Sequence, residues 1–427
     1  MPRAPRGLWH GKRRISVKPT ARGWQAIFFA TLSLATALLI GTTQIYQLAY
    51  ALAGLLLAAL LLGLFLSRGL RYARRIPEEE RLTVGRPSHV RLVLSNASRT
   101  RSPGITVVDH LPHRRLLETP PVEGSGTRET REPVLFEKRG LYRLGPAEIS
   151  TADPFGFLRF VRRFRVPEEV VVYPEVFELP ELPLKGRREE TGARGSFAQQ
   201  GDEFSGLREY RRGDDRRHIH WKSVARTGEL VVREFTHDAP QRHAVVLDLH
   251  RPGIGTDEAE VEDAVSAAGS ALLYLAREGL QFRLLTTGKG SGATAFGADE
   301  TDYWRAMDML ATARADGDAK LGDLLDEKLR EEREGLGEGA ILISRSHQDV
   351  LVQSVQKLRT AGLSVVVLAL AAHTYQSRGA TLGREATFSG HVRRLELAGA
   401  DVRVVRRPGG VSALAGMQRP VNARGEA

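Results

Sequence analysis

The longest apolar stretch of the chain lies near its start. No residue between positions 23 and 67 carries a charge, and as one helix this stretch would measure about 65 Å, roughly twice the ~30 Å hydrocarbon core of a bilayer. Polar residues at 41–44 divide it. The pattern predicts a transmembrane hairpin over 23–67, with spans at 24–40 and about 48–66. A cleaved signal peptide is the alternative, but its apolar region would be shorter and no second span would follow.

From residue 80 to about 178 the helical periodicity disappears. Short alternating or β-branched stretches, such as 89–95 and 170–173, stand between clusters of Pro, Gly, Asn and Ser. This pattern predicts a β-sandwich-like domain over 80–178. Residues 153–156, Asp-Pro-Phe-Gly, favour a turn. Residues 179–200 are rich in Pro, Gly, Arg and Glu and predict an exposed linker.

Beyond residue 243, apolar strands alternate with amphipathic helices. Continuous apolar runs are typical of parallel strands buried on both faces. We expect strands at 244–249, 282–286, 340–343, 363–370 and 402–405, and helices near 261–275, 302–311, 321–334 and 349–360. The alternation predicts a doubly wound α/β domain over 243–407. The following residues, 408–427, are rich in Gly, Pro and Arg and predict a flexible tail.

Charge is concentrated at one end of the chain. The formal net charge is +11, and residues 1–77 hold eleven basic and no acidic residues, leaving 51 basic against 51 acidic residues beyond them. The basic excess therefore indicates membrane topology and argues against a nucleic-acid partner. Because the basic clusters flank the hairpin on its outer ends, the positive-inside rule predicts an inner (plasma) membrane protein with both termini cytoplasmic, including the basic segment 1–22. Arg68, Arg71, Arg74 and Arg75 are expected near anionic headgroups.

The 201–242 block holds the densest set of unusual residues. Gly-x-Glu-Phe, Arg-x-Tyr, Gly-Asp and Ile-x-Trp follow one another in this order. The candidate binding residues of the block are Glu203, Phe204, Arg208, Tyr210, Gly213, Asp214, Arg217, Ile219, Trp221, Lys222 and Arg226. This order resembles the signature of the bacterial and archaeal family known as domain of unknown function 58. Upstream residues 139–142, 145–146 and 153–156 also match its usual run-up, so the resemblance covers nearly the whole chain.

Three interpretations of this block stay open. It can be a salt-bridged structural motif with Phe204, Leu207, Tyr210, Ile219 and Trp221 as buried anchors, or a protein-binding surface. It can also be catalytic, as in a hydrolase or a transglutaminase-linked factor that uses Asp202, Glu203, Asp214 and the nearby histidines. In an extended segment His218 and His220 would share one face, opposite Ile219 and Trp221. Their spacing to other ligands is not that of a zinc site, so we assign no metal there.

The resemblance also implies a von Willebrand factor A-like C-terminal domain. In such a domain a metal-ion-dependent adhesion site, Asp-x-Ser-x-Ser, follows the first strand and suits Mg²⁺ or Ca²⁺. Here Asp248 is followed by His250 and Pro252 at the serine positions, and Arg345 stands where the family often offers an aspartate. We expect Asp248 to be the remnant of a degenerate site, paired with Arg251 or Arg345, with neither a metal nor another cofactor bound.

These features favour a membrane-anchored, non-catalytic scaffold or adaptor. The resemblance implies a partner, a chaperone-like AAA+ ATPase of the methanol-dehydrogenase-regulator (MoxR) type, and a role in assembling or activating protein complexes, for example of the cell envelope. The lipid bilayer is the other expected partner. The absence of cysteine excludes disulfides and thiol catalysis. The alternatives are a hydrolase-type enzyme and a cation-dependent adhesion-type receptor, which would need its soluble part outside the cell.

Overall fold

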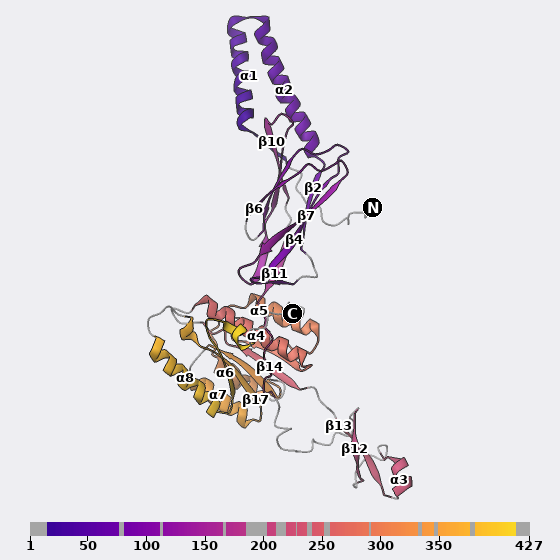
Figure 1. Cartoon of the computed structure of the whole chain (residues 1–427), viewed down its shortest axis with the longest axis vertical. Helices are drawn as coiled ribbons and strands as arrows, with labels where there is room; N and C mark the ends of the chain where they lie inside the picture. Colours follow the sequence, from indigo (N-terminus) through magenta and orange to yellow (C-terminus); the bar gives the residue numbers. More distant parts are fainter. Residues whose placement is uncertain are drawn as a thin grey trace. The chain divides into compact units, whose positions relative to one another are not determined.

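A computed structural model describes most of the chain (Figure 1). The molecule divides into two compact units, residues 1–173 and 174–427. The described residues are 15–76, 81–111, 114–164, 168–184, 203–210, 219–227, 229–236, 241–251, 257–289, 292–331, 335–345, 349–375 and 381–415.

Two long apolar helices dominate the start of the first unit. α1 (Ala21–Ile40) and α2 (Thr43–Ser67) lie side by side and are joined at Gly41, whose φ of 78° suits glycine (Figure 1). Thr20 caps α1, since its Oγ1 accepts the Gly23 N–H at 3.0 Å. Leu38 and Leu39 are 68% and 87% exposed. Both helices are long and apolar enough to cross a membrane, as the charge-free stretch predicts.

Three sheets form the rest of the first unit. The five-stranded antiparallel sheet has the order β1 (Ile15–Pro19), β10 (Leu158–Phe164), β9 (Ala147–Ala152), β5 (Ile105–His110) and β6 (Arg114–Thr119). A second sheet joins β2 (Leu70–Arg75), β4 (Pro87–Asn96) and β7 (Thr127–Leu135), and a third joins β3 (Leu82–Thr83), β11 (Glu168–Tyr173) and β8 (Gly140–Leu144). All three contribute to one apolar core, which fits the predicted β-rich domain.

The helices run directly into these sheets. β1 ends at Pro19, two residues before α1 begins, and β2 starts at Leu70, three residues after α2 ends. The basic N-terminal segment therefore contains a strand. The prediction that Arg74 lies near lipid headgroups is wrong. β2 directs the side chains of Tyr72 and Arg74 into the core, where the Arg74 guanidinium pairs with Asp109 and both side chains of the pair are fully buried.

The second unit is built on a five-stranded parallel sheet. Its order is β15 (Gln281–Thr286), β14 (Arg242–Leu247), β16 (Gly339–Ser344), β17 (Ser364–Leu370) and β18 (Asp401–Val405). Residues 292–297 bond to the outer edge of β15 in the antiparallel sense. This architecture fits the predicted α/β domain, and all five predicted strands are present.

Helices cover the parallel sheet. α6 (Leu321–Arg330), α7 (Asp349–Thr360) and α8 (Thr381–Leu397) share one core with Val246, Leu342 and Val367. α4 (Glu258–Arg277) packs on β14 and contacts α5 (Glu300–Thr312) and α9 (Gly410–Leu414). The sequence analysis missed α8, and a one-turn 3-10 helix, η3 (Ala372–Thr374), follows β17.

Two segments differ from the predicted boundaries. Residues 174–184, here called the strap, pack on α4 instead of forming the end of the sandwich and the start of an exposed linker. Val176, Leu182 and Leu184 are buried, and Ser266 donates to the Glu175 carbonyl at 2.6 Å. The predicted tail also begins with structure, because Val411 of α9 is 1% exposed. In both cases a few apolar residues within a charged composition decide the packing.

Candidate functional site

The motif block forms a small arm made of a hairpin and a short helix. β12 (Glu203–Glu209) pairs antiparallel with β13 (Val231–Thr236), with a register shift between Phe204 and Gly206. α3 (Trp221–Thr227) lies between the two strands in the sequence. Of the predicted site residues, Glu203, Phe204 and Arg208 belong to β12, whereas Gly213, Asp214 and Arg217 lie outside the described residues, as do Asp202 and His218.

Ile219 and Trp221 have opposite environments in this arm. Ile219 pairs with Val232 and is 7% exposed, as the structural interpretation expects. Trp221 is 63% exposed, so it is not a buried anchor. The reason is that the chain turns helical at this point: the N–H groups of Ser223 and Val224 both donate to the His220 carbonyl, which ends the strand alternation that would have kept Trp221 beside Ile219.

The exposed residues of the arm form a mixed apolar and cationic surface. Trp221 and Leu230 (47% exposed) supply its apolar part, and Lys222 and Arg226 of α3 are exposed cations. The Tyr210 N–H donates to the Leu230 carbonyl at 2.8 Å, which fixes Leu230 beside the end of β12. We call Trp221, Lys222, Arg226 and Leu230 the arm surface.

A second cluster of polar residues lies at the carboxyl end of the parallel sheet, where ligands bind in open α/β folds. Asp248 follows β14 directly and is 3% exposed. Its Oδ1 accepts the His250 N–H at 3.1 Å and lies 3.4 Å from the Thr287 hydroxyl. Thr287 in turn accepts the Leu249 N–H at 2.7 Å. Burial raises the pKa of Asp248, while the bond from His250 and the charge of Arg345 oppose this rise.

Arg345 follows β16, the strand next to β14, and lies close to Asp248. Its Nε lies 3.3 Å from Glu260 Oε1 of α4, and the two side chains are only 6% and 4% exposed. Its backbone N–H also donates to Asp248. Burial raises the pKa of Glu260, and Arg345 opposes this rise. Arg251, the other predicted partner of Asp248, pairs with Asp318 at 3.3 Å. Arg345 therefore contacts two buried carboxylates, Glu260 through its guanidinium and Asp248 through its backbone N–H.

Comparison with known families now bears on this geometry. Residues 206–290 match the family described as "Protein of unknown function DUF58". The chain carries a DUF58 segment. The predicted resemblance to this family is thus confirmed for residues 206–290, which include the arm from Gly206 onward, the strand that leads to Asp248, and Thr287 in the loop after β15.

Comparisons with whole proteins add little to the DUF58 match. No curated protein matches the chain. Among solved structures, the CARDB domain of a Pyrococcus furiosus protein is 11% identical, with 24% of this chain and 94% of that domain covered and a TM-score of 0.18. A GH2 beta-galacturonidase from Eisenbergiella tayi is 8% identical, with 79% of this chain and 55% of the enzyme covered and a TM-score of 0.15. Similarity this low carries no inference about fold or activity.

Other ionic clusters at the same end of the parallel sheet were not predicted from the sequence. The Tyr375 hydroxyl donates to Asp263 at 2.7 Å, and Arg407 lies beside both groups. Further along, Glu385 contacts His373 and pairs with Arg406 at 2.9 Å. Among the described residues, no group of three His, Asp or Glu side chains is placed to hold a metal ion.

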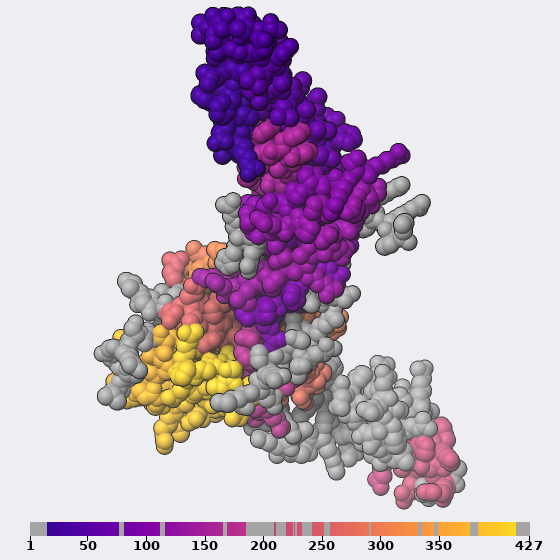
Figure 2. Space-filling view, turned by 45° about the horizontal axis from the view of Figure 1, so that its top comes forward, coloured from indigo at the N-terminus to yellow at the C-terminus, as the bar shows by residue number. Residues whose placement is uncertain are grey.

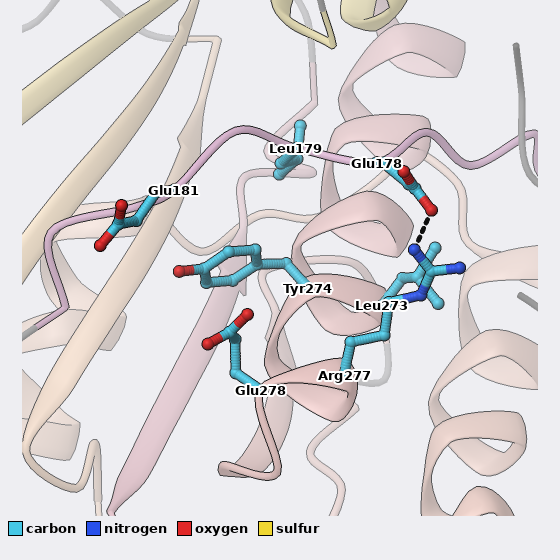
Figure 3. A pocket seen from close by; sticks show the side chains of 7 residues that line it. All are labelled: Glu178, Leu179, Glu181, Leu273, Tyr274, Arg277 and Glu278. Carbon is cyan, nitrogen blue, oxygen red and sulfur yellow. Dashed lines mark hydrogen bonds and ion pairs between the residues drawn. The ribbon is translucent and has the colours of Figure 1, made fainter. Parts of the chain in front are cut away.

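The strap adds a hollow that the sequence did not predict. It has a volume of about 320 Å³, and Figure 3 shows its lining side chains, which come from the strap and from the end of α4. Arg277 pairs there with Glu178, and the Tyr274 hydroxyl accepts the Leu182 N–H at 3.2 Å. Glu181 and Glu278 give the hollow an acidic character, but its lining contains no nucleophile paired with a base.

Proposed function

We propose that this protein is a membrane-anchored, non-catalytic scaffold that binds a partner protein through its DUF58 segment. The observation that carries the proposal is the arm surface: a tryptophan and a leucine stay exposed beside two cations within the segment that matches the family. Tryptophan and arginine are enriched among the anchor residues of protein interfaces. Its partner is expected to offer an apolar pocket with an acidic rim.

The anchor is supported by the exposure of the two apolar helices. Only 11% and 17% of their most apolar windows are buried, whereas the core helix of a soluble protein would be mostly buried. Leaving this much leucine and phenylalanine surface in water would cost about 25 cal/mol for each Å². The basic residues on the outer ends of the hairpin favour a plasma-membrane protein whose two units face the cytoplasm.

The surroundings of Asp248 favour a protein-binding role over metal-dependent adhesion or catalysis. Asp248 stands directly after the first strand of the parallel sheet, as the resemblance to von Willebrand factor A domains implies for a cation site. The buried Arg345 guanidinium already supplies positive charge there, and a divalent ion would be repelled by it at short range. We propose that in this A-like domain the Arg345–Glu260 ion pair takes the place of a bound cation, and that the domain is a rigid base for the arm.

The family resemblance suggests a MoxR-type AAA+ ATPase as the partner, and photo-crosslinking tests this. The full chain in detergent carries a photo-crosslinking amino acid in place of Trp221 and is mixed with the purified ATPase from the same organism. A crosslink is expected from this position. The matched control places the same group at Leu397 of α8, which is 78% exposed and apolar but outside the family match.

The strength of the contact gives a second measurement. We expect Trp221→Ser to weaken binding at least tenfold, since interface tryptophans often contribute 2 kcal/mol or more, while Leu397→Ser leaves it unchanged. Equal crosslinking from both positions, or unchanged binding by Trp221→Ser, would contradict the proposed surface. Loss of a chemical activity in a folded Asp214→Ala variant would instead favour the enzyme alternative.

A further inference from the structure

The turn between β9 and β10 lies against both apolar helices. The Thr20 N–H, at the start of α1, donates to the Phe157 carbonyl at 2.8 Å, and the Thr20 hydroxyl donates to the Gly156 carbonyl at 2.7 Å. A side chain at Gly23 would overlap the Phe157 carbonyl, and one at Gly63 of α2 would overlap the Phe160 ring. Figure 1 shows β10 reaching the ends of the two helices, and in Figure 2 magenta atoms sit against the indigo helices.

Helix length sets the level of this turn relative to a bilayer. The 20 residues of α1 span about 30 Å, which is the thickness of the hydrocarbon core, so the first turn of α1 lies at its boundary. The β9–β10 turn is hydrogen-bonded to that first turn and therefore lies at the same level. α2 is five residues longer than α1. Phe65 lies near the end of α2 that adjoins the β-sheets, and it is 55% exposed. The turn therefore lies at the level of the membrane interface and not beyond it in water.

The turn presents an aromatic pair at this level. Phe155 is 42% exposed and stacks on Phe157 with ring centroids 6.0 Å apart. The buried Asp153 accepts the Phe155 N–H at 2.8 Å, and the Gly156 N–H donates to the Asp153 carbonyl at 3.1 Å. The turn predicted from the sequence is therefore present and rigid. Trp24 of α1, 62% exposed, adds a third aromatic ring of the kind found at membrane interfaces.

Exposed basic residues lie at the ends of α1 and α2 and on the strands that adjoin them. All members of the set are exposed, and none has an acidic partner among the described residues. These residues, here called the basic collar, are Lys18, Arg22, Arg68, Arg71 and Arg159. Some other exposed arginines of the same unit do have acidic partners, as Arg101 has Glu123 and Arg143 has Glu169. A cluster without counter-ions at the membrane boundary fits anionic phospholipid headgroups.

We propose that the β9–β10 turn is a third membrane-contacting element, in which Phe155 and Phe157 enter the interface and the basic collar binds anionic phospholipid headgroups. This inference rests on the proposed anchoring by α1 and α2. The β-rich domain is then held on the membrane surface at three points instead of hanging from a flexible linker.

The absence of cysteine from the chain allows a direct test of depth. A nitroxide is attached to Phe155→Cys in the full chain, reconstituted in vesicles of phosphatidylcholine and phosphatidylglycerol. The control is Leu135→Cys, which is 44% exposed before substitution and pairs with Pro87 at the end of β4 far from the helices. We expect the label at 155 to be several-fold more accessible to oxygen than to a water-soluble nickel complex. The label at 135 should show the reverse.

Lipid selectivity tests the basic collar. The ratio of phosphatidylglycerol to phosphatidylcholine retained by the detergent-purified chain is measured by mass spectrometry. Arg22→Gln and Arg159→Gln should each lower it about fivefold, as expected for one interfacial charge, while Arg101→Gln leaves it unchanged.

Two outcomes overturn the proposal: a water-exposed label at 155, or a lipid ratio that the collar variants do not change. Alkaline extraction of membranes separates this failure from failure of the anchor. If the wild-type chain stays in the membrane pellet while the label at 155 is in water, the anchor stands and the third contact is wrong.

Discussion

Two buried arginines, one in each unit, show how differently the same side chain can be used. Arg74 meets a single carboxylate: its Nη2 and Nε bond to the two oxygens of Asp109, the Tyr72 hydroxyl donates to the same carboxylate, and the Gly145 carbonyl accepts from Nη2 at 3.0 Å. Arg345 meets two, because Glu260 pairs with its guanidinium and Asp248 accepts its backbone N–H.

The difference lies in the balance of charge. The Arg74 cluster is neutral and fully buried, which is what a structural ion pair needs in order to persist in a core. The Arg345 cluster has one more carboxylate than guanidinium, and burial raises the pKa of both acids. Carboxyl groups with a raised pKa beside a charged partner are found at functional sites and also in structural ion-pair networks. Arg74 therefore holds the β-rich domain together, whereas Arg345 offsets part of the negative charge buried beside β14 and β16.

The largest expected effect is in the balanced cluster. Asp109→Ala leaves the Arg74 charge buried without a partner and should destabilise the first unit by about 3–5 kcal/mol. Hydrogen exchange of the β4 amides in the detergent-purified chain measures this loss. The control, Glu169→Ala, removes a pair whose side chains are 80% and 56% exposed and should cost less than about 1 kcal/mol. Equal, small losses in the two variants would mean that burial does not strengthen the Arg74 pair.

His243, a buried histidine at the amino end of the parallel sheet, should also make the stability of the second unit depend on pH. His243 is fully buried, and burial lowers its pKa to about 4. The unfolded chain, with a pKa near 6.5, binds the proton more readily. His243 therefore contributes full stability above pH 6.5 and loses it as pH falls toward 4, by up to about 3 kcal/mol.

The two carboxyl groups whose pKa is raised change the stability with pH in the opposite direction. Asp248 and Glu260 favour the folded state at pH values below the unfolded pKa near 4, and this contribution is lost as pH rises through their folded pKa values. In His243→Leu the effect of the raised carboxyl pKa values should dominate, so urea midpoints followed by tryptophan fluorescence should fall as pH rises from 4 to 7. A midpoint that still rises steeply over this range would show that His243 is not the source of the acid sensitivity.

The elements that the sequence predicts well are those with continuous apolar runs. The two long apolar helices come from a charge-free stretch, and each parallel strand comes from a continuous short apolar run, and such runs leave few alternatives for burial. α8 was missed because only a few of its residues, Phe388 and Leu395 among them, enter the core, while Leu397 is exposed and most other positions are small, polar or charged. The strap was missed for the same reason.

The candidate sites were less predictable because they depend on partners far apart in the chain. Asp248 could be found from its position after a strand. The partner of Arg345 could not, since Glu260 lies 85 residues away and nothing local directs the guanidinium toward α4. Similarly, strand alternation at β2 predicts that residues 72 and 74 share a face, but only the position of Asp109 makes an inward arginine stable there. Side-chain pairing across elements is the part that one sequence does not contain.

The smallest of the three effects tests the unbalanced cluster itself. Arg345→Met removes the guanidinium beside Glu260 and should raise the pKa of Glu260 and of Asp248 further. Near pH 4 both carboxyl groups can be protonated, so the variant should lose little stability there. At pH 7 its free energy of unfolding should be about 2 kcal/mol below that of the wild-type chain. Urea midpoints at both pH values measure it.

The double variant Arg345→Met with Glu260→Gln separates charge from packing in the same cluster. It keeps the shape of both side chains approximately but removes one buried carboxylate along with the guanidinium, so its deficit should change less between pH 4 and pH 7 than that of Arg345→Met. If the single variant loses the same stability at both pH values, Arg345 acts through its packing against α4, and the distinction between the two buried arginines disappears.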